Sequence, residues 1–305
     1  MVNALKHFMQ LVLKKLRVQG VIIGNHTQGR LHVREEIQAL SPFFEFIHHD
    51  QLLERIVKNK QKPFCLITFD DGKKITATEA AIELERLGVP AVFYLVVDGV
   101  TNQRPLWFDR RNAIVRHLNR LPDDLEPEAM KRLPLAEINS LLDHYFNVYP
   151  VSLDMRDPRI ASMSWEDVSA LQHKGFTIGA HTVNHPILTN ETLVDAMQEI
   201  RMSISEVEKR TEHACQSFAF PNGNYTKALS RYAMECGVQT VMTTIPTWVH
   251  KNNCLWNLPR VDIYNHYDKN KIWLKLSAAL PGWMMKNPNG TGRKYVIEKW
   301  FMSLG

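Results

Sequence analysis

The sequence predicts an α/β protein with a mainly parallel sheet, and two features of its 305 residues support that class. Short apolar runs rich in Val, Ile and Phe, which favour strands, alternate along the chain with longer amphipathic segments, which favour helices. Strands that alternate with helices form βαβ units, which build parallel sheets. The chain has no internal repeat and no low-complexity linker, so we expect a single domain over residues 1–305.

The first third of the chain carries three predicted strands with helices before and after them. Apolar runs at 20–26, 64–69 and 90–98 indicate the strands. The last of the accompanying helices ends at Gly88, because glycine is the residue most often found just past a helix C-terminus. These helices are expected at 35–44, 50–60 and 76–88.

Residues 101–160 interrupt this alternation, since they are polar and aromatic at first and then largely helical, without a strand pattern. We predict a helical insertion or lid there. The alternation then resumes with a helix at 164–175, in which Ser164 and Asp167 resemble an N-terminal capping pair. Strands are expected at 176–182, 217–220, 238–244 and 258–263, and helices at 190–211 and 229–237.

Charge and cysteine content exclude several classes of function. The net charge is +5, and the 37 basic residues are scattered among 32 acidic ones, so we expect no nucleic-acid partner. A mild positive charge would suit an anionic membrane surface or substrate. The four cysteines show no CxxC spacing, which argues against a zinc-thiolate or disulfide framework; they are Cys65, Cys215, Cys236 and Cys254.

The sequence indicates a cytoplasmic protein. No stretch approaches the roughly 20 apolar residues that span a bilayer, and residues 1–20 lack a signal-peptide core and cleavage site. Apolar positions at helical spacing in residues 5–16 favour a helix packed on the domain over one lying on a membrane. The basic, apolar segment at 271–286 also favours a packed helix, and with the N-terminus it leaves peripheral membrane contact open.

Two adjacent carboxylates end the predicted strand in LITFDDGKK, residues 66–74. In sheets covered by helices, ligands bind at the carboxyl ends of the strands, so Asp70 and Asp71 should lie at such a mouth. The alternative is a turn that uses Asp-Gly for its backbone geometry alone.

Two histidines follow another predicted strand, in GAHTVNHP. His181 and His185 should therefore lie at the same mouth as the carboxylates. Two imidazoles and one carboxylate are the ligand set of catalytic zinc, which keeps one position open for water. Zinc is the expected ion, although cobalt, manganese, nickel or iron would also suit these ligands. The second carboxylate could then take a proton from the metal-bound water as general base.

The motifs TFDDG and HTVNH together resemble the polysaccharide deacetylase family, carbohydrate esterase family four, also known as the nodulation-deacetylase homology domain. The resemblance extends over about 64–262, through FAFPNGNY and LPRVD. It implies a distorted (β/α) barrel of about seven parallel strands and removal of acetyl groups from carbohydrates. It also implies that Asp70 is the catalytic base, and that the metal ligands are Asp71, His181 and His185.

The third motif of that family, FAFPNG here, implies an acetyl pocket. A backbone N–H just after Pro221, that of Asn222, would stabilise the oxyanion of the tetrahedral intermediate. Tyr225 either borders this pocket or is an ordinary turn aromatic. Members of the family often carry an arginine before the proline, but Ala219 and Phe220 stand here instead. Arg260 either braces the catalytic base from another strand or forms a surface salt bridge.

The C-terminal acid histidine of the family is also missing, and GVIIGNH stands before the first motif instead. This order resembles the circularly permuted subgroup that de-N-acetylates exopolysaccharide. His26 is therefore the candidate general acid, with an ordinary strand-end histidine as the alternative. His48 and His49 suit the role less well, because their stretch predicts a solvent-facing strand edge.

The expected function is a metal-dependent hydrolase that removes N-acetyl groups from an amino-sugar glycan or a lipid-linked glycan precursor. Hydrolysis of a non-carbohydrate amide is the alternative, followed by an inactive carbohydrate-binding homologue. A binder would have no need for a base beside a metal, which argues against the last. In the insertion, the aromatic and charged side chains at 107–111 suit either stacking on sugar faces or packing of the lid on the barrel.

Overall fold

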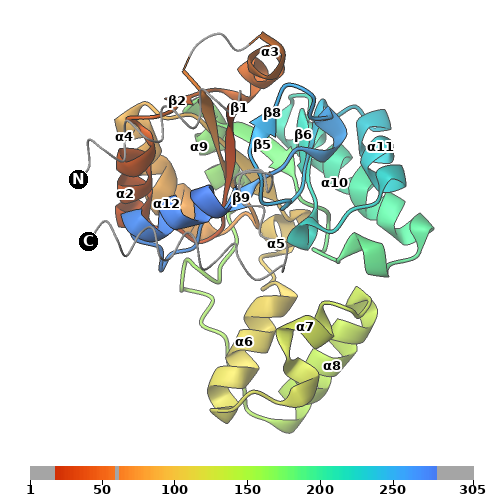
Figure 1. The fold of residues 1–305 in the computed structure, drawn as a ribbon. Helices are drawn as coiled ribbons and strands as arrows, with labels where there is room; N and C mark the ends of the chain where they lie inside the picture. The colour runs from red at the N-terminus through yellow and green to blue at the C-terminus, as the bar shows by residue number, and fades with distance from the viewer. Residues whose placement is uncertain (1–17, 59–61, 280–305) are drawn as a thin grey trace, which may run out of the picture.

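The computed structural model describes residues 18–58 and 62–279, and these form one sheet surrounded by helices (Figure 1). The strands of the sheet are β1 (Val18–Asn25), β2 (Glu45–Phe46), β3 (Phe64–Phe69), β4 (Ala91–Leu95), β5 (Thr177–Ala180), β6 (Ser217–Ala219), β7 (Thr240–Met242), β8 (Val249–His250) and β9 (Val261–Asp262).

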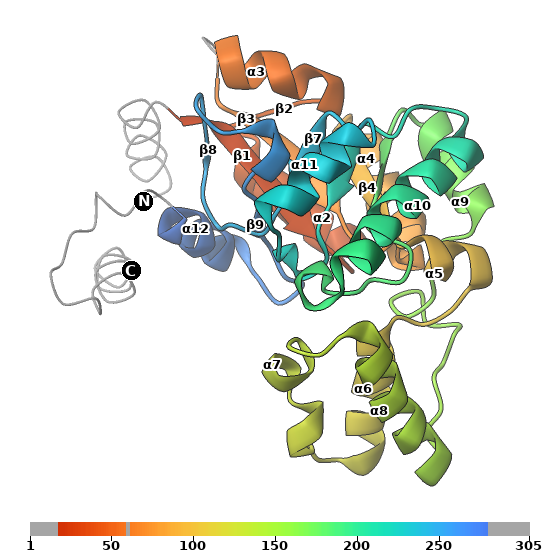
Figure 2. The same cartoon turned by 90° about the vertical axis from the view of Figure 1, so that its right-hand side faces the viewer.

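Most helices of the described residues cover the sheet, and α6 to α8 stand apart from it (Figure 2). The helices are α2 (Arg30–Leu40), α3 (Leu52–Lys58), α4 (Ala81–Leu87), α5 (Val97–Asn102), α6 (Trp107–Leu118), α7 (Pro127–Met130), α8 (Leu135–Val148), α9 (Trp165–His173), α10 (Leu193–Thr211), α11 (Lys227–Glu235) and α12 (Lys269–Ala278).

The sheet runs in the order β7-β6-β5-β4-β3-β1-β8, with β9 also paired to β1 and β2 to β3. All of these pairs are parallel except that of β1 with β8. Seven main parallel strands with helices around them confirm the predicted α/β class and the distorted barrel. Strand β1 lies between β3 and β9, so the N-terminal strand closes the sheet beside the last one.

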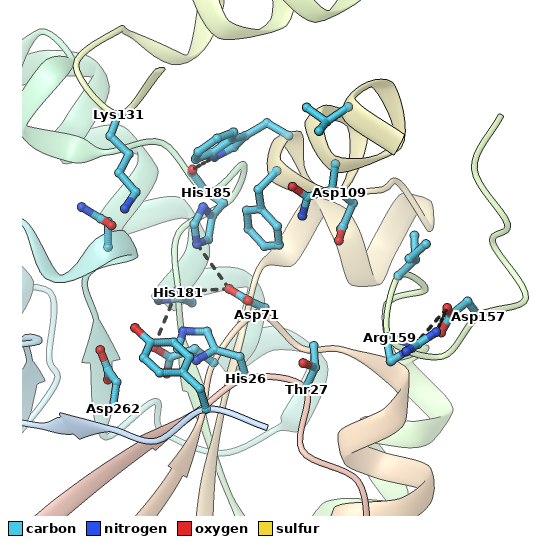
Figure 3. A pocket seen from close by; sticks show the side chains of 18 of the residues that line it. His26, Thr27, Asp71, Asp109, Lys131, Asp157, Arg159, His181, His185 and Asp262 are labelled. Atoms are coloured by element: carbon cyan, nitrogen blue, oxygen red, sulfur yellow. Dashed lines mark hydrogen bonds and ion pairs between the residues drawn. The ribbon is translucent and has the colours of Figure 1, made fainter. Parts of the chain in front are cut away.

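The register brings the ends of β1 and β3 together. Asn25 is paired with Phe69, and the Asp70 backbone N–H donates to the Asn25 carbonyl oxygen at 2.8 Å. The residues that follow each strand therefore start from one edge of the sheet. Figure 3 shows His26 and Asp71 at this edge, with His181 nearby.

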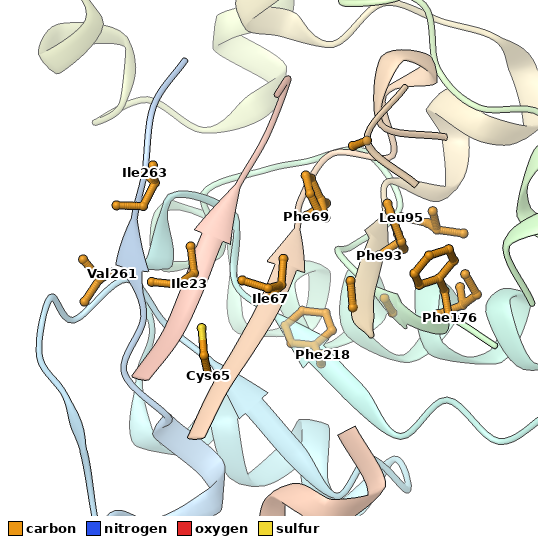
Figure 4. Packing of buried hydrophobic residues seen from close by; sticks show 14 of the residues in the cluster. Ile23, Cys65, Ile67, Phe69, Phe93, Leu95, Phe176, Phe218, Val261 and Ile263 are labelled. Atoms are coloured by element: carbon orange, nitrogen blue, oxygen red, sulfur yellow. The ribbon is translucent and has the colours of Figure 1, made fainter. Parts of the chain in front are cut away.

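Both faces of the central strands are buried, which explains their nearly continuous apolar sequence. On β3, Cys65, Ile67 and Phe69 pack in the larger cluster, between the sheet and its helices (Figure 4), whereas Phe64 and Leu66 face a smaller cluster on the other side. Alternate residues of a strand point to opposite faces, so one short run supplies both layers.

The insertion predicted at 101–160 consists of helices and irregular segments, and α6, α7 and α8 pack around a small core of their own. Its buried members are Trp107, Ile114, Leu125, Met130, Ile138 and Leu142. Figures 1 and 2 both show these helices grouped below the sheet, at its carboxyl edge. The insertion is therefore placed to cover the ends of the strands.

The structure differs from the predicted elements in a few places. The helix predicted at 76–88 starts with a π-helical turn at Thr76–Ala80 and becomes α4, which ends at the left-handed Gly88 (φ 65°). The strand predicted at 90–98 ends at Leu95, because the chain turns there into α5. The two-residue strands β2 and β8 were not predicted, since so few residues produce no periodic pattern.

The prediction of a solvent-facing edge is wrong for His49. Its side chain is 3% exposed, and its ring nitrogens lie 2.7 Å from Thr240 Oγ1 and 3.2 Å from Gln216 Oε1. Thr240 lies in β7, and Gln216 directly precedes β6. His49 is thus a core histidine of the sheet and does not take part in the mouth.

The helices predicted near the two ends of the sequence can be compared with the structure only in part. The N-terminal helix lies outside the described residues, as does the end of the segment predicted at 271–286. The first part of the segment predicted at 271–286 belongs to α12, which buries Ile272, Trp273 and Leu276. None of the helices in the described part of the chain has the length and apolar character that a membrane span needs. All four cysteines are free thiols.

One buried carboxyl group lies beneath the mouth. Glu36 of α2 is 2% exposed, and Asn25 Nδ2 donates to its Oε1 at 3.2 Å. Burial raises the pKa of Glu36 from 4.5 to about 7, although the hydrogen bond from Asn25 acts in the opposite direction. The folded protein therefore binds this proton more tightly than the unfolded chain does.

We predict that the free energy of unfolding falls by roughly 3 kcal/mol as pH rises from 4.5 to about 7, because burying the ionised Glu36 carboxylate is unfavourable. Between the pKa of 4.5 in the unfolded chain and that of about 7 in the folded one, Glu36→Gln should flatten this dependence in denaturant titrations. The exposed neighbour offers a control, Glu35→Gln, which should leave it in place. An unchanged pH profile in Glu36→Gln would contradict the prediction.

Candidate active site

A cavity of about 850 Å³ opens at the carboxyl edge of the sheet, between the strand ends and the insertion. That volume lies at the upper end of the usual range for ligand sites. The strand ends contribute polar and charged side chains, among them His26, Asp71 and His181 (Figure 3). Helix α6 contributes Trp107 and Phe108. The cavity residues used below are His26, Asp70, Asp71, Phe108, Asp109, Asn112, Val115, Arg116, Lys131, Asp157, Arg159, His181, His185, Asn222 and Asp262.

Three side chains converge on one point of this cavity. One ligand atom from each of Asp71, His181 and His185 lies within 4.8 Å of the others. His185 Nε2 is 3.3 Å from Asp71 Oδ1, and His181 Nε2 is 3.7 Å from the same oxygen. The structure therefore brings together the carboxylate and the two imidazoles that the sequence singled out, although 110 residues separate the two motifs.

The chemistry of these side chains fits a divalent metal ion. The Nδ1 of His181 is 2.8 Å from the carbonyl oxygen of Ala219, so it carries the proton and leaves the Nε2 lone pair free for a metal. Asp71 Oδ1 is buried and accepts no hydrogen bond from the described residues. A cation at this point would provide the missing partner for Asp71.

Burial and charge also keep the ligands in the protonation state that a metal needs. Burial by itself would raise the pKa of Asp71, but the neighbouring His185 outweighs this effect, and the pKa lies well below its ordinary value. Burial lowers the pKa of His181 to about 4. At neutral pH the carboxylate is therefore ionised and the His181 imidazole is neutral, as metal ligands require.

The backbone is unusual at both ligand loops. Asp71 (φ 72°) and Gly72 (φ 63°) form a left-handed turn immediately after β3, and Thr182 (φ 68°) and His185 (φ 59°) adopt the same region after β5. Non-glycine residues occupy this region only when the surroundings hold them there, and such residues cluster at functional sites. The Asp-Asp-Gly turn thus has the backbone geometry of a turn and also contributes side chains to the site.

Asp70 has a different partner from its neighbour. Arg260, which is fully buried, donates from both Nη atoms to the two carboxylate oxygens of Asp70, each at 2.6 Å. Its Nε also donates to the Thr243 carbonyl oxygen at 3.0 Å. Arg260 therefore stands behind Asp70 and is not among the residues that line the cavity, so the alternative of a surface salt bridge is wrong.

This ion pair determines the protonation of Asp70. Burial alone would raise the pKa of Asp70, yet the opposing effects, of which the positive charge of Arg260 is the largest, outweigh it, so the pKa lies below its ordinary value. The Asp70 carboxylate is thus ionised at neutral pH. Asp70 Oδ2 lies 3.9 Å from His181 Nε2, so the Asp70 carboxylate stands beside the candidate metal position.

His26 lines the other side of the mouth. Its ring is half-buried and stacks on Tyr264 with 6.4 Å between centroids, and its Nδ1 has no hydrogen-bond partner within 18–58 or 62–279. Asp262 lines the same cavity, and burial raises the pKa of its carboxyl group despite the opposing charge of Arg260. A side chain at Gly24 would have its Cβ 2.3 Å from Asp262 Oδ1, so glycine makes room for this carboxylate.

Of the residues in the predicted acetyl pocket, Pro221, Asn222 and Tyr225, only Asn222 lines the cavity. Asn222, in a left-handed conformation (φ 55°), lines the cavity, whereas Pro221 is buried beneath it. Tyr225 is not among the lining residues; its ring packs toward Phe220, with centroids 6.2 Å apart, and borders an adjoining hollow that shares Asn222 and Thr244 with the cavity. Tyr225 therefore behaves as a turn aromatic in this structure.

Comparison with known proteins agrees with this geometry. The sequence profile described as polysaccharide deacetylase matches residues 57–241. The chain belongs to the polysaccharide deacetylase family. This membership confirms the predicted family and its enzyme class, a carbohydrate deacetylase, and it agrees with a possible divalent-metal site at Asp71, His181 and His185. No curated protein matches the chain.

Solved structures show the same fold at low sequence identity. The deacetylase PplD of Streptococcus pyogenes, solved with acetate, is 14% identical with a TM-score of 0.58, and the match covers 84% of this chain and 97% of that one. IcaB of Ammonifex degensii is 14% identical with a TM-score of 0.56, over 83% and 94% of the two chains. The BpsB deacetylase domain of Bordetella bronchiseptica is 16% identical with a TM-score of 0.52, over 80% and 96%.

The insertion contacts the metal-ligand loop of this deacetylase directly. The indole Nε1–H of Trp107 donates to the backbone carbonyl of His185 at 3.2 Å, and the Phe108 ring meets the His185 ring edge-on with 5.3 Å between centroids. These contacts hold a ligand whose backbone is left-handed. The aromatic pair at 107–108 therefore packs the insertion against the barrel. This was one of the two alternatives that the sequence left open for 107–111, the other being stacking on sugar faces.

A buried ion pair anchors the same end of α6. Lys73 is fully buried, bonds to the Asp109 carboxylate, and also donates to the Ile160 carbonyl oxygen at 3.1 Å. Lys73 thus joins the turn after Asp71 to both ends of the insertion. Sequence reasoning missed Lys73 and Asp109. The lysine directly after the Asp-Asp-Gly turn was the available signal, but it gave no indication of its partner.

We predict that Trp107→Phe weakens metal binding about tenfold, because it removes a hydrogen bond that holds the backbone of one ligand. Titration of the apoprotein with Zn²⁺ against a competing chelator measures this affinity. The matched control is Trp165→Phe, since the indole of Trp165 also donates one bond of 3.2 Å, to Thr101 Oγ1, in a part of the structure outside the cavity. Equal metal affinity in the two variants would contradict the positioning role.

Proposed function

We propose that this deacetylase is a metal-dependent hydrolase that removes N-acetyl groups from an amino-sugar glycan or a lipid-linked glycan precursor. The observation that carries the proposal is that two adjacent carboxylates have different partners. Asp71 faces two imidazoles, while Asp70 is held ionised by Arg260 beside the same point. A site that only bound sugar would have no need for this second carboxylate.

The ion that we propose is zinc, since one carboxylate and two imidazoles are typical ligands of catalytic zinc. When bound, a divalent cation would acidify a coordinated water and polarise the acetyl carbonyl. Asp71, His181 and His185 would hold it. Cobalt, manganese, nickel and iron would also suit the same ligands.

Asp70 acts as the general base in this proposal. Its carboxylate accepts the proton of the attacking water, and Arg260 keeps it ionised and in a fixed orientation before the reaction. The bidentate geometry allows the guanidinium to hold the carboxylate without entering the cavity. Asp70 is therefore the catalytic residue, and Arg260 is a positioning residue that acts through it.

The remaining steps fall to the opposite walls of the cavity. The backbone N–H of Asn222 is the proposed donor to the developing oxyanion, since Asn222 follows Pro221 and lines the cavity. His26 is the proposed general acid that protonates the departing amine. Its support is its place at the end of β1, where it faces the same cavity as Asp70 and Asp71.

We predict that the purified protein releases acetate from N-acetylglucosamine oligomers, and that a chelator abolishes this activity until zinc is restored. Asp70→Asn should lower kcat at least a hundredfold with nearly normal metal content, because it removes only the base. Asp71→Asn should lose the metal itself. Acetate release and metal content are measured on the same samples, and full activity in both variants would disprove the assigned roles.

A panel of substrates separates the proposal from its alternative. Release of acetate from acetylated amino sugars, but not from acetylated peptides or simple amides, supports a carbohydrate substrate. The reverse pattern would indicate that this barrel hydrolyses a non-carbohydrate amide.

The pH profile should depend on Arg260. Because the charge of Arg260 lowers the pKa of Asp70 against the effect of burial, Arg260→Lys, which cannot make the bidentate bond, should raise that pKa. We predict that the acid limb of kcat/KM moves to higher pH by roughly one unit. The control is Arg34→Lys, which alters an arginine that also bonds to one carboxylate, that of Glu83; neither residue lines the cavity. An acid limb that stays in place would mean that Asp70 is not the titrating base.

A further inference from the structure

One side of α6 forms a wall of the cavity and extends away from the metal ligands. Phe108, Asn112, Val115 and Arg116 line the cavity at helical spacing, so they share one face of the helix. Phe108 contacts the His185 ring at one end of this face. Arg116 lies eight residues further on, about 12 Å along the helix axis.

Most carboxylates of the cavity already have a partner. Asp70 pairs with Arg260 and Asp109 pairs with Lys73, whereas Asp71 belongs to the candidate metal site. Of the remaining two acids, Asp157 pairs with Arg159 at 2.6 Å. Burial raises the pKa of Asp262, which disfavours its charged form. The cavity therefore offers little free negative charge to a cationic ligand.

Two cations of the cavity are not neutralised in this way. Within the described ranges, the exposed Arg116 makes no hydrogen bond or ion pair with its guanidinium. Arg159, which is bonded to Asp157, lowers the pKa of that carboxyl group most, and the charge of Arg116 also lowers it. Lys131 lies directly after α7, and among the described residues its Nζ bonds only to Glu128, at 3.2 Å; the Glu128 side chain is 79% exposed. Such exposed pairs contribute little, so Lys131 remains available for another anion. Figure 3 shows the Lys131 side chain pointing into the pocket.

We propose that Arg116 and Lys131 form a subsite for an anionic group of the substrate, a phosphate or a carboxylate. This inference rests on the proposed deacetylation of a glycan. Arg116 can bind either oxyanion with two parallel hydrogen bonds, and Lys131 adds a second positive charge. Asn112 and Val115 lie between this subsite and the metal ligands. They provide a polar and an apolar contact for the intervening sugar.

The distance along α6 limits the substrate. An anion bound by Arg116 lies roughly one or two sugar residues from the acetyl group that is removed. A uronic-acid neighbour in an acidic glycan and the diphosphate of a carrier-linked sugar are two sources of such a group. A neutral homopolymer of N-acetylated sugars would leave Arg116 and Lys131 without a partner.

The test compares ligands of similar size that differ in charge. The zinc-loaded full-length Asp70→Asn variant is titrated calorimetrically with an N-acetylglucosamine trimer, with a trimer in which glucuronic acid replaces the middle sugar, and with a diphosphate-linked N-acetylglucosamine. At low ionic strength we expect at least one anionic ligand to bind about tenfold more tightly than the neutral trimer. Added salt should reduce that preference.

Substitutions identify the residues responsible. Adding Arg116→Gln should remove the preference for the anionic ligand and leave the affinity for the neutral trimer unchanged. The control, Arg120→Gln, alters an exposed arginine just past the end of α6 that is not among the cavity residues, and it should change neither affinity. The pair Lys131→Gln and Arg132→Gln repeats this comparison on the α7 side.

The outcomes separate the subsite from the enzymatic function. Preference for the glucuronic-acid trimer indicates an acidic glycan, and preference for the diphosphate indicates a carrier-linked precursor. Equal binding of neutral and anionic ligands, equal weakening of both by Arg116→Gln, or no binding by any of them would overturn the subsite. Acetate release by the enzyme without the Asp70 substitution is measured separately. Its absence from every glycan would refute the proposed function, whatever the binding preference.

Discussion

Two neighbouring carboxylates are buried at the end of one strand, and the site depends on how each of their charges is compensated. A buried charge is strongly unfavourable unless it has a partner and hydrogen bonds. Asp70 has Arg260 behind it, with both carboxylate oxygens bonded at 2.6 Å. Asp71 faces two imidazoles, and one of its oxygens has no hydrogen bond from the described residues. The two partners differ, so adjacent side chains of the same type can take different roles.

The sheet topology makes this compensation possible. Strand β1 lies between β3 and β9, so the residues after β1 and β3 and those on β9 gather at one edge. His26, Asp70 and Asp262 therefore share one cavity although they are far apart in sequence. Arg260 precedes β9 and reaches Asp70 from the interior of the sheet. An arginine in a different strand thus compensates the charge of the carboxylate at the end of β3.

The insertion is part of the site as well as its cover. Lys73 joins the metal-ligand turn to both ends of the insertion, and Trp107 bonds to the backbone of His185. From this fixed end, α6 extends along the cavity toward Arg116. The same helix therefore contacts a candidate metal ligand at its start and places a cation in the cavity two turns further on. If both proposals hold, one helix would link the position of the reacting group to a more distant part of the substrate.

The sequence by itself determined seven of the nine described strands, their order along the chain and the residue types that follow them, because periodicity and turn chemistry are local. Asp71, His181 and His185 could be predicted from that information and from the family resemblance. Only the tertiary structure decided that Arg260 reaches Asp70 across 190 residues, that Tyr225 turns away from the cavity, and that Lys73 is buried against Asp109. Contacts between distant segments depend on how strands and helices pack in three dimensions, and no spacing within one segment records that packing.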